Sequence, residues 1–341
     1  MPIWTKVAGT WKKVLDPEVK KNGAWTPVKV VSVKVGGVWQ QVFAIEVVAF
    51  ISANSLNVSM QSLFTSPIWT NPLIKKRVVV NSGVIVGSTN PAVAALRTGT
   101  GWAGTLQLDN YGEIQGAGGA PNSGAGGHAI LCEAAGLIIK NNWAIRGGGG
   151  AGGKGGNGGP GIYYTTITEG PFYSGYPGGT GTRYYWSTSP GSVDTVWWAN
   201  AGLNLGDINS PHTRDGITWT RGIQRDSSES GGFTTNIFEI RRSYQSPNGT
   251  SGGAGGNGGR GKGYGQTNAA GSSGSAGGTN AGTGGTGGTG GDWASGGATG
   301  ATGNSGNNGG GSAGTGGGAA GKAISGSNTL INTGVINGAT S

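Results

Sequence analysis

GGGGAGGKGGNGGPG, the sequence of residues 147–161, repeats with a period of three residues. Its non-glycine residues stand at every third position, as Ala151, Lys154, Asn157 and Pro160. The same period returns in residues 252–261 and 283–292. An α-helix repeats every 3.6 residues or so and a strand about every two, so the period of these tracts matches neither.

The left-handed three-residue helix matches this period. It rises about 3.1 Å per residue without internal hydrogen bonds, so its buried N–H and C=O groups need partners in neighbouring helices. Two glycines in every three residues allow the backbones to approach closely enough. We predict a mainly β N-terminal region followed by a bundle or sandwich of polyglycine II helices with loop insertions, and almost no α-helix. The alternatives are a disordered Gly/Ser linker, which has no fixed period, and collagen, which is rich in proline.

Glycine is distributed unevenly over the 341 residues. Nine of the 77 glycines precede Tyr111 and 13 lie in residues 162–250, so most fall in two flanking tracts. With 34% hydrophobic and 11% charged residues, an apolar core fits mainly into the first third of the chain. We therefore divide the chain into an N-terminal repeat segment, a small β domain, a polyglycine scaffold and an insertion, at residues 1–45, 46–110, 111–161 with 251–341, and 162–250.

The charge and the single cysteine limit the classes of partner. The net charge of +9 would suit nucleic acid, but the N-terminal lysines are spread among apolar residues in a strand-like pattern, which favours a solvated edge or a protein contact. Cys132 has no second cysteine to pair with, and its apolar neighbours predict a buried thiol. We expect no nucleic-acid partner. We also expect synthesis in a cytoplasm and no membrane span, because no signal peptide or sufficiently long apolar run is recognisable.

Residues 5–42 contain three copies of a 14-residue repeat, TKVAGTWKKV, VKKNGAWTPV and VKVGGVWQQV in their matching parts. Each copy predicts a strand, a turn at glycine and a second strand that begins with tryptophan. Three equal copies favour the hypothesis that residues 1–45 seat one chain on the end of a threefold-symmetric partner. A plain β-meander with a tryptophan core is the alternative. The predicted attachment residues are Trp4, Trp11, Trp25 and Trp39.

A second motif, N-x-G-x-I-x-G, links the predicted β domain to the glycine tracts. Its four copies begin at Asn81, Asn110, Asn141 and Asn332, and the third has Trp143 where glycine is expected. We interpret the copies as short coils, two of which lead directly into glycine tracts. The last copy predicts that the C-terminus returns to pack with the earlier coils.

Within residues 111–161 a glycine-histidine step is followed by a coil that ends in glycine, namely Gly126, Gly127 and His128, then Asn141, Asn142, Ala144, Ile145 and Gly147. With these residues the region resembles the receptor-binding tip adhesins of long tail fibres in T-even-type bacteriophages. The resemblance extends over roughly residues 105–341 and implies a monomeric tip on a trimeric fibre of the virion. It also implies a polyglycine II sandwich whose distal loops bind an outer-membrane protein of a Gram-negative host. The tryptophan repeat and the 89-residue interruption depart from the family pattern.

That interruption, residues 162–250, holds 14 of the 27 aromatic residues. Tyrosine and tryptophan give large contact areas at low entropic cost, so we predict that this insertion binds the receptor, either protein loops or lipopolysaccharide. Its arginines, Arg242 among them, either contact phosphate or acidic loops of the receptor or form a solvated surface; the sequence favours neither. The alternative is that the aromatics form the insertion's own core. The predicted receptor-binding residues are Tyr163, Tyr164, Phe172, Tyr173, Tyr176, Tyr184, Tyr185, Trp186, Trp197, Trp198, Trp219, Phe233 and Phe238.

Catalysis has little support in the sequence. His212 lies between Asp207 and Asp215 in a stretch typical of a surface turn, and the carboxylates Asp194, Glu229 and Glu239 have no spacing that favours glycoside hydrolysis. We expect no catalytic residue, no metal and no cofactor. The other functions considered are a tailspike-like protein that binds or hydrolyses glycans, and a structural glycine-rich protein.

Overall fold

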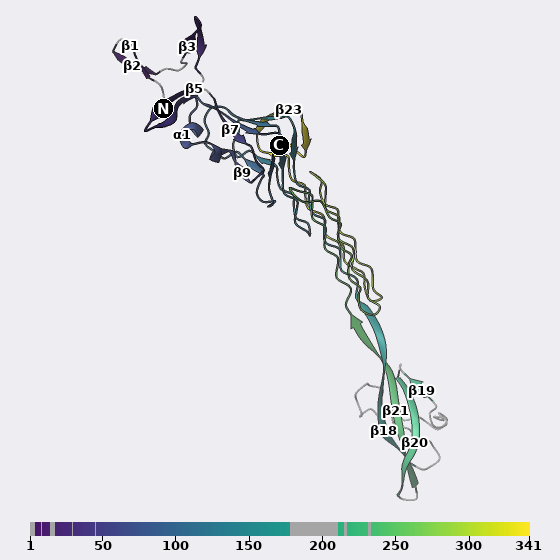
Figure 1. Ribbon diagram of the computed structural model, residues 1–341. Coiled ribbons are helices and arrows are strands. Elements are labelled where there is room, and N and C mark those ends of the chain that lie inside the picture. The colour runs from purple at the N-terminus through teal and green to yellow at the C-terminus, as the bar shows by residue number, and fades with distance from the viewer. Residues whose placement is uncertain are drawn as a thin grey trace. The chain divides into compact units, whose positions relative to one another are not determined.

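The computed structural model describes residues 4–7, 9–13, 18–28, 30–44, 46–177, 211–214, 217–230 and 233–341 (Figure 1). The chain divides into two compact units, one made of Met1–Pro160 with Ser251–Ser341 and the other of Gly161–Thr250. Among the described residues, the only helices are η1 (Met60–Leu63) and α1 (Ser66–Trp69). The prediction of a mainly β protein with almost no α-helix is confirmed.

Each copy of the 14-residue repeat forms one antiparallel hairpin. In the second hairpin Asn22 and Gly23 have φ of 53° and 84°, and in the third Gly36 and Gly37 have φ of 59° and 86°. Positive φ at both central residues is what a type I′ turn requires, and this turn suits the twist of a two-residue hairpin. The strands are β1 (Trp4–Val7) with β2 (Thr10–Lys13), β3 (Glu18–Lys21) with β4 (Ala24–Pro27), and β5 (Val30–Val35) with β6 (Val38–Ala44).

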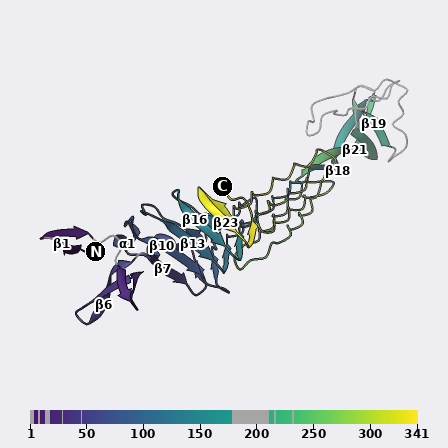
Figure 2. The ribbon, with the colours of Figure 1, turned by 90° about the horizontal axis from the view of Figure 1, so that it is seen from above.

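Three parallel sheets follow, and each takes one strand from each successive coil of the chain. Figure 2 shows the strands of the first sheet side by side. This arrangement is a parallel β-helix with three faces. The first sheet contains β7 (Glu46–Ile51), β10 (Lys75–Val80), β13 (Leu106–Asn110), β16 (Leu137–Asn141) and β23 (Asn328–Asn332). The second contains β8 (Ser55–Leu56), β11 (Ile85–Gly87), β14 (Glu113–Gln115), β17 (Ala144–Arg146) and β24 (Val335–Asn337). The third contains β9 (Val58–Ser59), β12 (Leu96–Arg97), β15 (Ile130–Leu131) and β22 (Ile324–Ser325).

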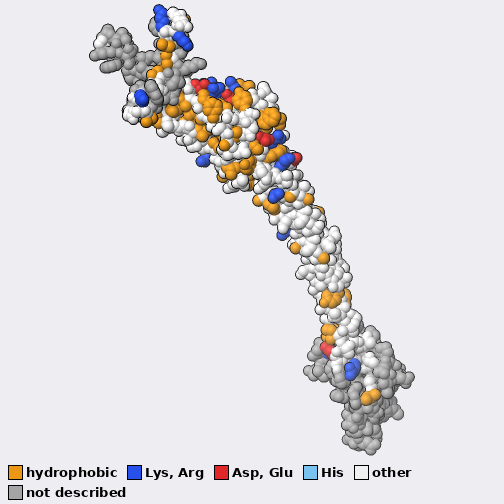
Figure 3. Space-filling view, in the orientation of Figure 1, with side chains coloured by type: hydrophobic (Ala, Val, Ile, Leu, Met, Phe, Trp, Pro, Cys, Tyr) orange, Lys and Arg blue, Asp and Glu red, His pale blue; other side chains and the backbone are white. Residues whose placement is uncertain are grey.

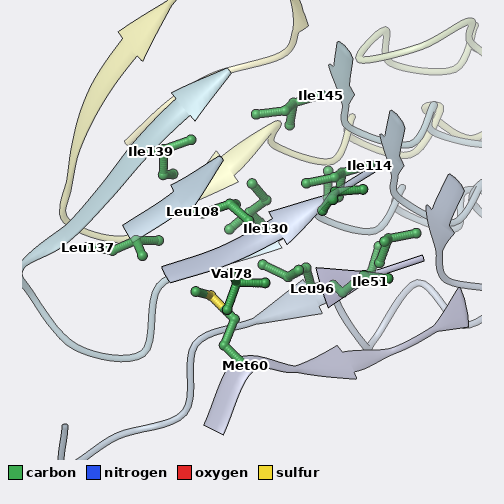
Figure 4. Packing of buried hydrophobic residues seen from close by; sticks show 14 of the residues in the cluster. Ile51, Met60, Val78, Leu96, Leu108, Ile114, Ile130, Leu137, Ile139 and Ile145 are labelled. Carbon is green, nitrogen blue, oxygen red and sulfur yellow. The ribbon is translucent and has the colours of Figure 1, made fainter. Parts of the chain in front are cut away.

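The interior of the β-helix is filled by aliphatic side chains from all three sheets (Figure 4). Leu108, Ile114, Ile130, Ile139 and Ile145 are fully buried. Burial of one such side chain contributes about 1.5–3 kcal/mol to folding. This core places the apolar residues in the first part of the chain, as the composition predicted. It also extends beyond residue 110, where the sequence predicted that the β domain ends, because each later coil adds strands to the same sheets.

An asparagine ladder explains the N-x-G-x-I-x-G motif. Asn110, Asn141 and Asn332 are aligned in register, and each side-chain amide donates to the next, at 2.8 Å from Asn110 to Asn141 and 2.7 Å from Asn141 to Asn332. The C-terminal copy joins the end of the stack through β23 and β24, as predicted.

The first copy of the motif is out of register with the other three. Val80, and not Asn81, lies opposite Asn110, and Val86, and not Ile85, lies opposite Ile114. The corner before β11 is longer than the later corners, which shifts this coil. As a result Asn110 Oδ1, at the end of the ladder, has no hydrogen-bond partner among the described residues.

The glycine tracts leave the β-helix after β14 and after β17, and are neither helix nor strand. Residues 147–160, the central segment, donate backbone hydrogen bonds of 2.8–2.9 Å to two neighbouring segments in a period of three. Gly149, Gly152, Gly155 and Gly158 donate to the carbonyls of Lys262, Gly259, Gly256 and Gly253 of an antiparallel segment. Gly150, Gly153, Gly156 and Gly159 donate to those of Ser295, Ala298, Ala301 and Asn304 of a parallel segment.

The second compact unit is a four-stranded antiparallel sheet in the order β18-β21-β20-β19. The long strands β18 (Gly161–Pro177) and β21 (Phe233–Thr250) pair with each other, and β20 (Ile217–Ser230) pairs with the other side of β21. The short strand β19 (Pro211–Arg214) pairs with β20. We call this unit the insertion sheet.

Candidate functional site

The two ends of the insertion sheet are adjacent. Gly161 at the start of β18 is paired with Thr250 at the end of β21. In the glycine region, Gly158 donates a hydrogen bond to the carbonyl of Gly253 at 2.8 Å. The chain therefore leaves the glycine region and re-enters it at neighbouring positions, so the insertion interrupts the scaffold sequence without separating its segments.

The insertion sheet changes its strand register part-way along β18 and β20. In β18 the shift follows Glu169, so Gly170 and Pro171 together lie opposite Arg241, and Gly170 has φ of 107°. In β20 shifts occur between Arg221 and Gln224 and again before Asp226. Extra residues of this kind are β-bulges, which bend a strand and increase its twist. The sheet therefore has a bend in the middle, and we call the part between Gly161 and Glu169, with its β21 partners, the neck.

A polar cluster lies directly beside the bend. The Glu169 carboxylate accepts hydrogen bonds from Arg242 Nε at 2.7 Å and from the Tyr244 hydroxyl at 3.0 Å, and it is also ion-paired with Arg242 Nη2. Arg242 is only 2% exposed. The hydrogen bond that Tyr244 donates to Glu169 raises the pKa of its phenol above the ordinary value. We call Glu169, Arg242 and Tyr244 the clamp.

The clamp was missed by sequence reasoning. Arg242 was considered as a surface cation for receptor or lipopolysaccharide contact, and that expectation is wrong for this residue because its guanidinium is buried against Glu169. Arg241, its neighbour in the strand, is exposed. Only the Glu-Gly-Pro sequence of residues 169–171, with glycine and proline inside a strand, pointed to a bulge at this place.

In a comparison with protein families, residues 46–233 match the family described as phage tail fibre adhesin Gp38. The chain belongs to this family. The match runs from the first strand of the β-helix to the start of β21, which is more than half of the chain. The predicted resemblance to tail-fibre adhesins is therefore confirmed. Searches among curated proteins and among solved structures gave no match.

Membership of the Gp38 family carries two consequences at the level of the whole protein. A tail fibre adhesin is a binding protein of the virion tail fibre, and its partner is a receptor on the host. The parts of the chain that the structure describes include no helix with the length and hydropathy needed to span a membrane.

Those predicted receptor-binding aromatics that the structure describes lie in three strands of the insertion sheet. Tyr164 in the neck is 61% exposed, and Tyr163 beside it is half-buried. Beyond the bend, Tyr173 lies opposite Glu239 and Tyr176 opposite Asn236. The other predicted residues of the described strands are Phe172 in β18, Trp219 in β20, and Phe233 and Phe238 in β21. Tyr184, Tyr185, Trp186, Trp197 and Trp198 lie outside the described residues.

The predicted attachment tryptophans all lie in hairpin strands. Trp4 and Trp11 belong to the first hairpin, Trp25 lies in β4 of the second and Trp39 in β6 of the third. Trp11, Trp25 and Trp39 occupy equivalent positions early in the second strand of each hairpin, opposite Lys6, Lys20 and Lys34. The three copies of the repeat thus form the same local structure.

The residues considered for catalysis are not brought together by the described structure. His212 lies in β19, Glu229 in β20 and Glu239 in β21, while Asp194, Asp207 and Asp215 lie outside the described residues. Over the described ranges, no group of three or more His, Cys, Asp and Glu side chains is placed to hold a metal ion. Cys132 is buried, as predicted, and burial raises the pKa of its thiol to about 11.

Proposed function

We propose that this adhesin recognises its receptor through the insertion sheet and the residues that connect its strands. The observation that carries the proposal is that Gly161–Thr250 form a compact unit of their own, inserted at one point of the glycine scaffold and rich in aromatic residues. Aromatic side chains on strands and loops are suited to tight, largely pre-organised contacts. The receptor would be an outer-membrane protein or lipopolysaccharide of a Gram-negative host, and recognition would be reversible and non-catalytic.

We further propose that the glycine segments adopt the polyglycine II conformation. Their hydrogen bonds recur at every third residue and join separate segments, as this helix requires. None of the glycines of the central segment has a positive φ. In Figure 3 the surface of the glycine segments is mostly white, the colour of backbone and uncharged polar residues, with scattered hydrophobic and basic side chains. A bundle of this kind is held together by backbone hydrogen bonds, so it would support the insertion although the bundle itself has no apolar core.

The hairpins are proposed as the attachment to the fibre. Three copies of one hairpin, each with a tryptophan at the same position, are suited to a partner that offers the same surface three times. Such a partner is the trimeric end of a tail fibre. The adhesin would then be located at the distal tip of the fibre in the virion, after synthesis in the host cytoplasm.

The decisive experiment removes the insertion sheet and measures binding to host cells. Gly161 and Thr250 are paired with each other. Residues 162–249 can therefore be replaced by an Asn-Gly turn that connects Gly161 to Thr250 as a short hairpin. We expect this variant to keep the melting transition of the β-helix and to lose binding to host cells. Binding at the level of the full chain would show that the receptor site lies elsewhere.

A matched control keeps the insertion and alters the hairpins. Substitution of Trp11, Trp25 and Trp39 by alanine should leave binding of the purified protein to host cells unchanged, because these residues belong to the proposed fibre attachment. The same variant should fail to join purified fibres in a co-sedimentation assay. A glycan-hydrolysing function would instead appear as shortening of purified O-antigen by the full chain.

A further inference from the structure

The clamp holds two strands together through both oxygens of one carboxylate. Glu169 Oε2 is engaged by the Arg242 guanidinium, and Oε1 accepts the hydrogen bond of the Tyr244 hydroxyl. Arg242 lies directly opposite Glu169 in the register, while Tyr244 lies two residues further along β21. A carboxylate held from two directions has a fixed position and a fixed orientation. The clamp therefore fixes where β18 lies relative to β21 at this point.

The bulges beside the clamp are where the sheet can change its bend. Gly170 and Pro171 follow Glu169 directly, and the bulges of β20 lie opposite the residues that precede Arg241 in β21. Bulges on both strands that flank β21, at nearly the same level, allow the sheet to bend and twist there. Figure 1 shows the strands of the insertion sheet twisting about each other. Backbone hydrogen bonds alone do not define the angle of such a bend, whereas a side-chain contact beside it can.

The burial of Arg242 makes the clamp selective for one geometry. A guanidinium that is 2% exposed has lost most of its hydration, and a buried charge without its partner is strongly unfavourable. A change in the bend that separated Arg242 from Glu169 would break this buried ion pair and its hydrogen bond. By contrast, the neck pair Thr166 and Gln245 is exposed, so its hydrogen bond of 2.9 Å exchanges easily with water.

We propose that the clamp is a positioning device for receptor recognition, in which Glu169 sets the angle at which the strands beyond the bend are presented. This inference rests on the proposed receptor-binding function of the insertion. Phe172, Tyr173 and Tyr176 follow the bulge on the same strand as Glu169, and Trp219 lies opposite Arg242 in β20. Residues that act together on one receptor must keep their mutual geometry within a fraction of an ångström to about one ångström. A fixed bend supplies this geometry before the receptor arrives and reduces the entropy lost on binding.

The test compares Glu169→Gln with the matched control Gln245→Ala in the full chain. Glu169→Gln removes the charge that pairs with Arg242, whereas Gln245→Ala removes a cross-strand hydrogen bond of the same neck without touching the clamp. We expect Glu169→Gln to weaken binding to host cells at least about tenfold. The control should bind like the unaltered protein.

A structural readout separates positioning from simple stabilisation. Cys132 is buried, so spin labels can be attached selectively to cysteines introduced at Thr168, before the bend, and Thr235, beyond it. Glu169→Gln should broaden the distribution of distances between the two labels, and Gln245→Ala should leave it narrow. The charge-swapped double variant, Glu169→Arg with Arg242→Glu, should restore both the narrow distribution and part of the binding.

The outcomes are distinguishable. If removal of the whole insertion leaves binding intact, the proposed function is wrong. If that removal abolishes binding while Glu169→Gln binds normally with a narrow distance distribution, only the positioning role is wrong. Should Glu169→Gln unfold the insertion, Tyr244→Phe decides, because it keeps the ion pair and removes one hydrogen bond. Weaker binding with a broader distribution in Tyr244→Phe supports the clamp, and unchanged values of both overturn it.

Discussion

His128 lies between a glycine segment and β15, and its side chain serves as an acceptor for a distant part of the backbone. The N–H of Lys322, which leads into β22, donates to His128 Nδ1 at 3.0 Å. Only a neutral imidazole can accept this bond. Burial, and secondarily the charge of Lys322, lower the pKa of His128 below its ordinary value of 6.5. His128 thus joins two points at which the chain returns to the β-helix after a glycine segment, one before β15 and one before β22.

This contact predicts a loss of stability in mild acid. Because the pKa of His128 is lower in the folded than in the unfolded chain, its contribution is complete above about pH 6.5 and is lost as the pH falls through the folded pKa. His128→Asn keeps a neutral acceptor that does not titrate in this range. We expect the melting temperature of the unaltered protein to fall more steeply between about pH 7 and pH 5 than that of His128→Asn. Parallel curves for the two proteins would contradict the role given to His128.

At the scale of the element, the central segment shows what two glycines in three achieve. A side chain at Gly152 or Gly155 would overlap the carbonyl oxygen of Gly288 or Gly285, whereas Lys154 is exposed. The N–H groups of the third position are also satisfied, since Lys154 donates to Thr315 Oγ1 at 2.7 Å and Asn157 donates to Ser312 Oγ at 2.8 Å. Serine and threonine at period three thus replace backbone acceptors that the neighbouring segment does not supply.

Substitution of a buried glycine should therefore cost much more than substitution of its exposed neighbour. Gly155→Ala forces the central segment away from its neighbours, and overpacking of this kind costs about 1–3 kcal/mol or more. Lys154→Ala should change the free energy of unfolding by less than roughly 0.5 kcal/mol. Thermal unfolding of both variants checks this difference. Equal effects would mean that the close packing of the segments contributes little.

The hydroxyl acceptors give a separate prediction. Thr315→Val removes the acceptor for the Lys154 N–H and a side-chain contact with Ser123. The loss should lower the free energy of unfolding by about 1 kcal/mol. Thr299→Val, at an exposed position of another segment, is the matched control and should have little effect. Hydrogen exchange of the Lys154 amide provides the direct measurement, since it should become faster only in Thr315→Val.

At the scale of the whole molecule, the regions proposed for attachment, scaffold and recognition occupy separate stretches of the chain. The hairpins precede residue 46, the β-helix and glycine segments form the first compact unit with them, and Gly161–Thr250 form the second. Deletion of residues 1–44 should therefore leave the melting transition of the β-helix and binding to host cells unchanged, while abolishing association with purified fibres. Loss of cell binding in this variant would mean that the hairpins take part in recognition.

The sequence predicted those features that follow from a local period. A repeated pattern underlies the three-residue glycine period, the hairpin turns at glycine and the return of the last coil through Asn332. It did not reveal features that depend on contacts between distant residues. The register of the first coil was missed because a longer corner shifts Asn81 out of the ladder. The clamp was missed because Glu169 and Arg242 are 73 residues apart and look like ordinary surface charges in a strand pattern.

The position of the central segment also dictates an order of assembly during synthesis. This segment is completed at Pro160, but the neighbours to which most of its N–H groups donate lie between Gly253 and Asn304, beyond the whole insertion. A ribosome therefore releases the insertion sheet, whose pairings are internal, before the glycine segments have their partners. Domains generally fold as units while the chain emerges. The insertion sheet is thus able to fold first, and the glycine segments complete their hydrogen bonds last.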